Sequence, residues 1–262
     1  MRVIDVHTHP VFRGLSLFGK PTSLNRVIAH GRRHNIVHMI VLGDVLLYGA
    51  TPNAAQLRKI NDDTVKVLKT RPDYFTGFIY LNPLLGERAT MAETERCLKA
   101  VPGFRGIKLE IANNAAHPAM RHVAKAARTF NLPVLQHSWS TSNMVRDRSF
   151  QSDPVDTALF ARRNPDVKVI MAHLTGIGFR GVLEAKGLPN LYVDTSGGWP
   201  EEGLVEFAIE HLGPDRLLYG SDIPVRESAI TIGRILGARI SAADRHKVLF
   251  GNTARLLNLK FN

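Results

Sequence analysis

Apolar and β-branched residues gather in short runs that recur at intervals of roughly thirty residues, and amphipathic stretches lie between them. This alternation is typical of repeated βα units, in which helices cover a parallel sheet on both faces. The runs predict eight strands, at residues 3–6, 37–42, 74–81, 106–109, 133–136, 167–171, 191–193 and 216–219. The amphipathic stretches include predicted helices at residues 53–69, 89–100, 119–130, 154–163 and 201–211.

Turn-forming tripeptides stand where these helices should give way to the next strand. They are Asn-Leu-Pro at 131–133, Asn-Pro-Asp at 164–166, Leu-Pro-Asn at 188–190 and Gly-Pro-Asp at 213–215. No linker divides the chain, so we expect a single-domain (β/α)8 TIM barrel of the α/β class over residues 1–262. An open doubly wound sheet is the alternative. Its glycine-rich turn is missing after the first strand, where His7-Thr8-His9 stands instead.

Composition adds limits to this picture. Hydrophobic residues make up 44% and charged residues 22% of the 262 positions, as in ordinary globular proteins. The longest apolar runs are far shorter than the roughly 20 residues that cross a bilayer, and Asp5, His7 and His9 interrupt any signal-peptide core. We therefore expect a cytoplasmic protein without a membrane partner. The single cysteine, Cys97, lies in a predicted helix and is interpreted as a small buried side chain.

The net charge of +11 favours acidic partners. The basic residues come in pairs at most, such as Arg32-Arg33, and no long basic run with interleaved aromatic residues occurs. We therefore expect a small anionic substrate rather than a nucleic acid. The sequence does not fix the oligomeric state, and a homo-oligomer is compatible with it.

Candidate chemistry is concentrated where predicted strands end. His7 and His9 end the first strand, where alternate side chains share a face, and three further residues follow later strands: His137, His173 and Asp222. Active sites of such barrels lie at the carboxyl ends of the strands. Imidazole and carboxylate groups are ligands that suit Zn, Mn or Fe and can leave a position open for water. The other histidines, at positions 30, 34, 38, 117, 122, 211 and 246, are interpreted as ordinary surface or core residues.

With these strand ends the sequence resembles the amidohydrolase superfamily, and more closely its amidohydrolase-related branch, which includes the aminocarboxymuconate semialdehyde decarboxylase type. The resemblance rests on Ile4-Asp5-Val6-His7-Thr8-His9, Gly106-Ile107-Lys108-Leu109, Gln136-His137-Ser138, Ala172-His173-Leu174, Gly220-Ser221-Asp222-Ile223-Pro224 and Gly251-Asn252-Thr253-Ala254-Arg255-Leu256-Leu257. These motifs cover essentially the whole chain in the right order.

The resemblance implies one catalytic divalent-metal site, whose ligands would be His7, His9, His137 and Asp222. His173 would bind a second ion or orient the substrate, and Asp222 would also act as a base. Zinc is the expected metal, with Mn and Fe as alternatives. Such an ion lowers the pKa of bound water toward about 7, and an adjacent carboxylate can accept the proton.

Residues beside this ligand set are assigned smaller roles. Lys108 stands where binuclear relatives have a carbamylated lysine; modified it would bridge two ions, and free it could bind a substrate carboxylate. We favour one ion. Glu110 could be a ligand if the strand continues, but it is expected to be a solvent-facing loop carboxylate, and Asp5 is expected to be a buried hydrogen-bonding partner. Residues just past strand ends would shape substrate binding: Arg13, Trp139, Arg146, Arg180, Trp199 and Arg226.

The first functional hypothesis is hydrolysis of an ester, lactone or amide bond in a small carboxylated molecule. The second is non-hydrolytic decarboxylation with much the same ligands; His7 favours hydrolysis, because decarboxylase relatives often have an acidic residue there. A TatD-like deoxyribonuclease is a third, favoured by the net charge but opposed by Lys108 where that family has a glutamate. A barrel that only binds ligands is the last, and the gathering of five polar residues at one rim argues against it.

Overall fold

The computed structural model describes residues 1–11, 23–45, 47–49, 51–110, 113–140, 152–199 and 201–261. Eight parallel strands pair in chain order, from β1 to β8. They are β1 (Val3–Thr8), β2 (Ile36–Val41), β3 (Phe75–Tyr80), β4 (Phe104–Leu109), β5 (Val134–Gln136), β6 (Val169–Met171), β7 (Leu191–Asp194) and β8 (Leu217–Leu218). The predicted (β/α)8 TIM barrel is confirmed, and each predicted strand overlaps an observed one.

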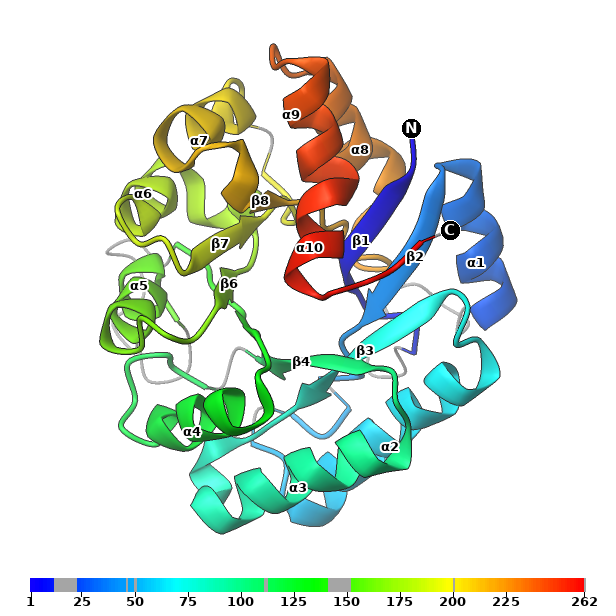
Figure 1. The fold of residues 1–262 in the computed structure, drawn as a ribbon, viewed down its shortest axis with the longest axis vertical. Coiled ribbons are helices and arrows are strands. Elements are labelled where there is room, and N and C mark those ends of the chain that lie inside the picture. The colour runs from blue at the N-terminus through cyan, green and yellow to red at the C-terminus, as the bar shows by residue number, and fades with distance from the viewer. Residues whose placement is uncertain are drawn as a thin grey trace.

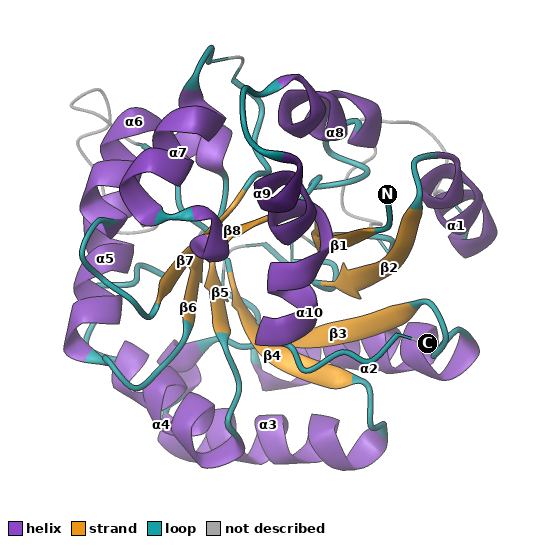
Figure 2. Cartoon of the chain, turned by 45° about the horizontal axis from the view of Figure 1, so that its top comes forward, coloured by secondary structure: helices purple, strands orange, loops and turns teal. Residues whose placement is uncertain are grey.

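Helices surround the strands on the outside (Figures 1 and 2). They are α1 (Leu24–Arg33), α2 (Ala54–Thr70), α3 (Glu87–Ala100), α4 (Met120–Phe130), α5 (Pro154–Arg163), α6 (Leu174–Ala185), α7 (Leu204–Leu212), α8 (Ser228–Gly237), α9 (Ala242–His246) and α10 (Asn252–Leu256). Short 3-10 turns lie at Pro83–Leu85 and Pro214–Arg216, and a π turn at Lys247–Gly251 joins α9 to α10. Within the described residues, no helix is long and apolar enough to cross a membrane.

Local sequence signals explain where several helices begin and end. Asn53 and Gln56 form a capping box at the start of α2, and Asp153 and Asp156 form another at the start of α5. Asn131 ends α4 in the left-handed conformation, with φ of 52°. The turn tripeptide that begins at Asn131 therefore stops the helix and starts the next strand, as the sequence predicted.

The core has two layers. Inside the barrel, residues from alternate positions of the strands pack together, including Ile40, Phe78 and Ile170. Leu256 and Leu257 at the end of α10 belong to the same cluster, so the C-terminal segment covers one end of the barrel. A larger outer layer lies between strands and helices and contains the fully buried Cys97, whose thiol pKa is raised by burial. The interpretation of this cysteine as a core residue is confirmed.

The first and last strands meet and bring distant parts of the chain together. The Val6 amide donates to the Tyr219 carbonyl at 2.9 Å, and further along the same seam the Asp222 amide donates to the His7 carbonyl at 2.8 Å. The His9 amide in turn donates to the carbonyl of Ile223 at 2.7 Å. These backbone bonds place the end of β1 directly beside the turn that follows β8.

Candidate metal centre

Two imidazoles and one carboxylate converge at the seam between β1 and β8. The Nε2 atoms of His7 and His9 lie 3.5 and 3.6 Å from Oδ1 of Asp222. One ligand atom from each of the three residues lies within 4.8 Å of the other two, and all three residues are buried. Three of the residues that the sequence grouped by strand position are thus brought together at distances from which a single cation could be shared.

The other nitrogen of each ring is held by the protein. Nδ1 of His7 lies 2.8 Å from a carboxylate oxygen of Asp194, and Nδ1 of His9 lies 2.8 Å from the carbonyl oxygen of Gly43. A proton on Nδ1 satisfies each acceptor and leaves Nε2 with its lone pair directed toward Asp222. This is the arrangement of metal-binding histidines, whose second nitrogen donates to a carboxylate or carbonyl. The donor set therefore fits a divalent cation.

Asp194 is a residue that sequence reasoning missed. It is fully buried at the end of β7, where its Oδ1 also accepts hydrogen bonds from the backbone amides of His173 and Ser196. Burial acts to raise its pKa, but the charge of His7 and hydrogen bonds from His7 and Ser196 outweigh it, so the pKa is lowered and the carboxylate stays ionised. The predicted strand stopped at Val193; one residue more would have applied the same strand-end rule to Asp194.

Asp222 is held in an unusual backbone conformation. Its φ is 66°, in the left-handed region that non-glycine residues seldom adopt, and its carbonyl accepts from the Arg226 amide in the following turn. Burial raises the pKa of its carboxyl, while the charges of His7 and Lys108 oppose that rise. A carboxylate with a raised pKa is a better proton acceptor than one in water.

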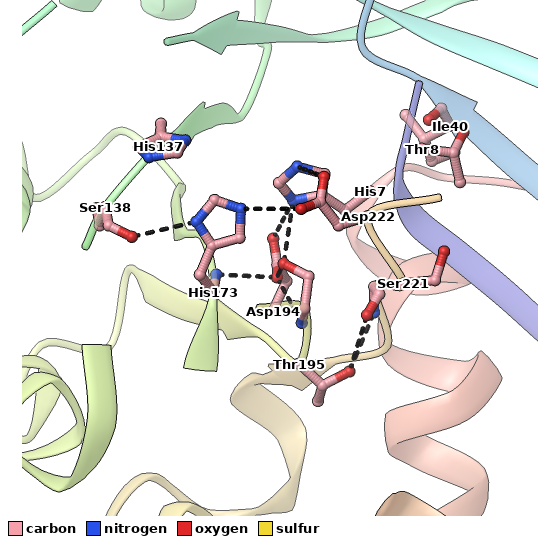
Figure 3. Close-up of polar contacts among 12 residues, drawn as sticks. His7, Thr8, Ile40, His137, Ser138, His173, Asp194, Thr195, Ser221 and Asp222 are labelled. Atoms are coloured by element: carbon pink, nitrogen blue, oxygen red, sulfur yellow. Dashed lines mark hydrogen bonds and ion pairs between the residues drawn. The ribbon is translucent and has the colours of Figure 1, made fainter. Parts of the chain in front are cut away.

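His173 borders the three residues, and His137 lies beyond it (Figure 3). Nε2 of His173 is 3.9 Å from Oδ2 of Asp222, and its Nδ1 is 3.2 Å from the Ser138 carbonyl oxygen. The ring centroid of His173 lies 4.9 Å from that of His7 and 4.6 Å from that of His137. The five residues at the carboxyl-end rim of the barrel are His7, His9, His137, His173 and Asp222. These rim residues are therefore contiguous, although His137 lies outside the tightest group of three.

Burial keeps two of these imidazoles neutral. It lowers the pKa of His9 to about 3 and that of His173 well below its ordinary value, and neighbouring positive charges lower both further. At His7 burial also acts to lower the pKa, but the contact with Asp194 reverses the net shift. Neutral imidazole is the form that binds metals, so the surroundings of His9 and His173 favour ligation over protonation.

The expectation that Glu110 faces solvent is wrong. The residue is only 6% exposed, and its two oxygens lie 3.0 Å from Nζ of Lys108 and 3.0 Å from Nδ1 of His137. Burial acts to raise its pKa, but the charges of Lys108 and His137 lower it well below the ordinary value. Lys108 itself is fully buried. β4 ends at Leu109, where the sequence placed its end, but Glu110 still points inward like Lys108 two residues earlier.

Two tryptophans form an aromatic wall beside the rim. The ring centroid of Trp139 lies 5.6 Å from that of His173 and 5.1 Å from that of Trp199, which is 46% exposed. Trp139 can take this position because residue 176 is a glycine. A Cβ atom there would lie 2.5 Å from the Trp139 ring and would collide with it. Both tryptophans thus occupy positions consistent with the substrate contacts expected of them.

The arginines expected to bind substrate differ in their surroundings. The guanidinium of Arg226 packs over Gly198, next to Trp199, whereas Arg180 pairs with the buried carboxylate of Asp153 and donates to Ser140 Oγ at 3.2 Å. Arg226 therefore lies against the backbone just before Trp199, while Arg180 contacts the residue that caps the start of α5. Arg13 and Arg146 lie outside the described residues.

Asp5 is buried below the rim, as expected, and it accepts hydrogen bonds from two backbone amides. Its Oδ1 accepts from the amide of His7 at 3.2 Å and from the amide of Ser221 at 2.9 Å. Burial raises its pKa to about 7. Asp5 therefore helps to join β1 to the turn that carries Asp222.

A family model described as amidohydrolase matches residues 4–259 of the chain. A search of curated protein sequences found no match. Among solved structures, 5-carboxyvanillate decarboxylase LigW from Sphingomonas paucimobilis has 17% sequence identity and a TM-score of 0.77, and the alignment covers 99% of each chain. The family match extends over nearly the whole barrel and over every rim residue.

Two further solved structures have different stated activities. A putative 2-pyrone-4,6-dicarboxylic acid hydrolase from Pseudomonas putida has 20% identity and a TM-score of 0.69, with 100% of this chain and 99% of that chain covered. A dihydroxybenzoic acid decarboxylase from a Polaromonas species, solved with manganese and the inhibitor 2-nitroresorcinol, has 18% identity and a TM-score of 0.75, with 100% and 98% covered. At these identities the likeness establishes the fold.

Proposed function

Because this chain belongs to the amidohydrolase family, we propose that it is a metal-dependent hydrolase acting on a small carboxylated molecule. The observation that carries the proposal is the placement of Asp222 within 3.9 Å of three imidazoles, those of His7, His9 and His173. A carboxylate so placed can share a cation with the histidines and also reach a water molecule held beside them. The bond cleaved would be an ester, lactone or amide.

The proposed ligands are His7, His9, His137 and Asp222. A divalent cation bound there would act as a Lewis acid and lower the pKa of water toward about 7. Zinc suits a set of imidazoles and one carboxylate, and the manganese of the Polaromonas enzyme makes Mn the first alternative. Glu110 holds Nδ1 of His137 at 3.0 Å, so the Nε2 of this ring is the nitrogen available for the shared ion.

Asp222 is the proposed general base. Burial raises its pKa, and the carboxylate borders the place where the attacking water would be held. It would accept the proton of that water and then deliver it to the leaving oxygen or nitrogen. His173 holds its Nδ1 proton against the Ser138 carbonyl oxygen, so its unprotonated Nε2, which borders the Asp222 carboxylate, would orient the substrate by accepting a hydrogen bond from it.

The contact between Lys108 and Glu110 supports a centre with one ion. Nζ of Lys108 lies 3.0 Å from Glu110, which supplies the negative charge that balances a free ammonium group in a fully buried position. A carbamylated Lys108 would place a second anion against Glu110, and like charges at this distance repel. Elemental analysis of protein purified without chelators would test the ion count.

The surroundings of the rim support a planar, anionic substrate. The edge-to-face pair of Trp139 and Trp199 offers a flat apolar surface next to His173, and Arg226 offers a cation beside it. The related structures are named as enzymes of aromatic or pyrone carboxylates, and one of them holds a nitroresorcinol inhibitor. We therefore propose a ring compound with at least one carboxylate.

Decarboxylation is the second candidate, favoured by the decarboxylases among the structural neighbours. Both reactions need a cation and an acid-base residue next to it, and they differ in their products. The protein loaded with Zn or Mn should be incubated with carboxylated lactones and with hydroxybenzoates in water enriched in ¹⁸O. Incorporation of ¹⁸O without release of CO2 is the expected result. Release of CO2 would replace hydrolysis with decarboxylation as the proposed reaction. If neither metal supported turnover of any of these compounds, both candidates would be overturned.

A further inference from the structure

A second group of two histidines and a carboxylate lies away from the rim. His30 is in the last turn of α1, His34 caps the end of that helix, and Glu227 precedes the first residue of α8. One ligand atom of each residue lies within 4.8 Å of the others, and none of the three residues is fully buried. The sequence interpretation treated both histidines as ordinary surface or core residues.

This group contains more than a simple pair of one histidine and one glutamate. Nε2 of His30 lies 3.0 Å from Oε1 of Glu227, yet it is inaccessible to water and makes no well-aligned hydrogen bond with any described residue. The ring of His34 lies edge-on to that of His30, with centroids 4.8 Å apart. Four-residue spacing puts both rings on one side of the helix, facing the same carboxylate. Two imidazoles and one oxygen donor are a ligand set for a borderline divalent cation.

We propose that His30, His34 and Glu227 form a second divalent-cation site, selective for Zn²⁺, Ni²⁺ or Cu²⁺ over Mg²⁺ and Ca²⁺, which joins α1 to the start of α8. Imidazole nitrogen binds the first group of metals well and the hard alkaline-earth cations poorly. The ion would complete its coordination with water, because the Glu227 side chain is 51% exposed.

The site would act on the turn that carries Asp222. Glu227 ends this turn, which is closed by the hydrogen bond from the Arg226 amide to the Asp222 carbonyl. A cation that bridges α1 and Glu227 would hold the far end of the turn against the first βα unit. Ions that bind only the native state also stabilise it in proportion to their concentration. The proposal does not depend on the reaction catalysed at the rim.

Nearby positive charge sets an upper limit on affinity. Arg26, Arg33 and Arg226 line the same surface cavity as His30 and Glu227, whose volume is about 450 Å³. Nη2 of Arg33 lies 3.3 Å from Nδ1 of His30. When Nε2 of His30 binds an ion, the ring proton is on Nδ1, so the guanidinium group of Arg33 would have to move away. Exposed arginine side chains can turn toward solvent at little cost. We therefore expect weaker binding here than at the rim, with a dissociation constant in the micromolar range.

The test removes the rim site first. In the variant His7→Ala/His9→Ala/Asp222→Asn, titration of the metal-free protein with ZnCl2 in a calorimeter should still show one bound ion per chain. Adding His34→Ala should abolish this binding, and adding Glu227→Gln should weaken it at least tenfold. Gln keeps an oxygen that can cap α8, where Glu227 accepts from the Ala229 amide at 3.3 Å. His246→Ala is the matched control, an exposed helical histidine that stacks on Phe250.

The expected pattern is loss of one ion with His34→Ala and an unchanged isotherm with His246→Ala, with circular dichroism unchanged throughout. Binding that survives His34→Ala unchanged, or a parent that binds no Zn²⁺ below about 1 mM, overturns the proposal. Equal binding of Mg²⁺ and Zn²⁺ would also overturn it, because it would show general attraction to a carboxylate rather than ligation by imidazole.

Discussion

The rim centre and the cluster between α1 and α8 contain the same donor types, two imidazoles and one carboxylate, in very different surroundings. At the rim, His7 and His9 are 1% and 4% exposed, and Asp194 and Gly43 fix their second nitrogens. In the cluster, the His30 side chain is 21% exposed, and an arginine rather than an acceptor lies at its second nitrogen. The two groups have the same donor types but differ in burial and in the partner of the second imidazole nitrogen.

This difference separates catalysis from simple binding. Rings whose tautomer and orientation are fixed before the ion arrives lose little freedom on binding, and they hold a reactive water in one place. Partly exposed rings whose second nitrogen has no fixed acceptor can adapt to an ion but are less suited to aim it at a substrate. We therefore expect substitutions at the rim to change turnover and matched substitutions in the cluster to change only ion content and stability.

The largest expected effect is that of Asp222→Asn. Asp222 is the proposed general base, and loss of such a base typically costs a factor of about 10² to 10⁴. Loss of a proposed charged ligand adds to this, so we expect kcat/KM to fall at least about 1,000-fold. The measurement is steady-state kinetics on the identified substrate, with thermal melts to confirm the fold. Glu227→Gln makes the same chemical change in the cluster and should leave kcat/KM within about twofold. Equal losses in both variants would contradict the contrast.

Asp194→Asn should have the next largest effect. The amide oxygen of asparagine can still accept a hydrogen bond from Nδ1 of His7, but it carries no negative charge. Loss of such a charged partner typically lowers metal affinity by about 10-fold to 100-fold. Competition with a chromophoric chelator would measure the affinity, and His38→Gln would serve as the control because His38 lies at the start of β2, away from the rim. An unchanged affinity in Asp194→Asn would mean that the tautomer of His7 is set in another way.

His38 provides a third histidine environment, buried without a candidate ion. Burial lowers its pKa to about 4, so between this value and the ordinary value near 6.5 the unfolded chain binds more protons than the native one. Its stabilising contribution is therefore complete above about pH 6.5 and is lost as the pH falls toward 4, and about 2 kcal/mol of it is lost between pH 7 and pH 5. Urea unfolding at pH 7 and pH 5 would measure this, and His38→Gln should flatten the dependence. A variant as acid-sensitive as the parent would refute the assignment.

The smallest expected effect comes from adding Zn²⁺ to the protein with its rim intact and already loaded. Further Zn²⁺ at ten times the dissociation constant of the cluster should stabilise the native state by about 1.4 kcal/mol, seen as a rise in melting temperature of a few degrees. His34→Ala should remove the rise and His246→Ala should keep it. Turnover should not change with either. A change in turnover would mean that the cluster positions the Asp222 turn during catalysis.

The sequence predicted the barrel well because hydrophobic runs are local signals. It also predicted the grouping of His7, His9 and Asp222, because the carboxyl ends of parallel strands necessarily share one face. It missed Asp194 through an error of one residue at a strand end. It misjudged Glu110 because periodicity does not show where a strand's inward register ends.

Other features were beyond any local pattern. The pairing of Arg180 with Asp153 joins two helices whose relative placement depends on the packing of α5 against α6. The cluster of His30, His34 and Glu227 depends on the contact between the first and last βα units. Four-residue spacing of two histidines was visible in the sequence, but their carboxylate partner comes from the far end of the chain.

The meeting of the first and last strands also has a consequence for biosynthesis. His7 and His9 leave the ribosome well before Asp222, which lies 213 residues after His9 in the sequence. A nascent or prematurely ended chain therefore carries two of the three donors and cannot yet assemble the full trio. In the proposed enzyme, tight capture of the ion would coincide with closure of the barrel, which cannot happen before Asp222 has been made.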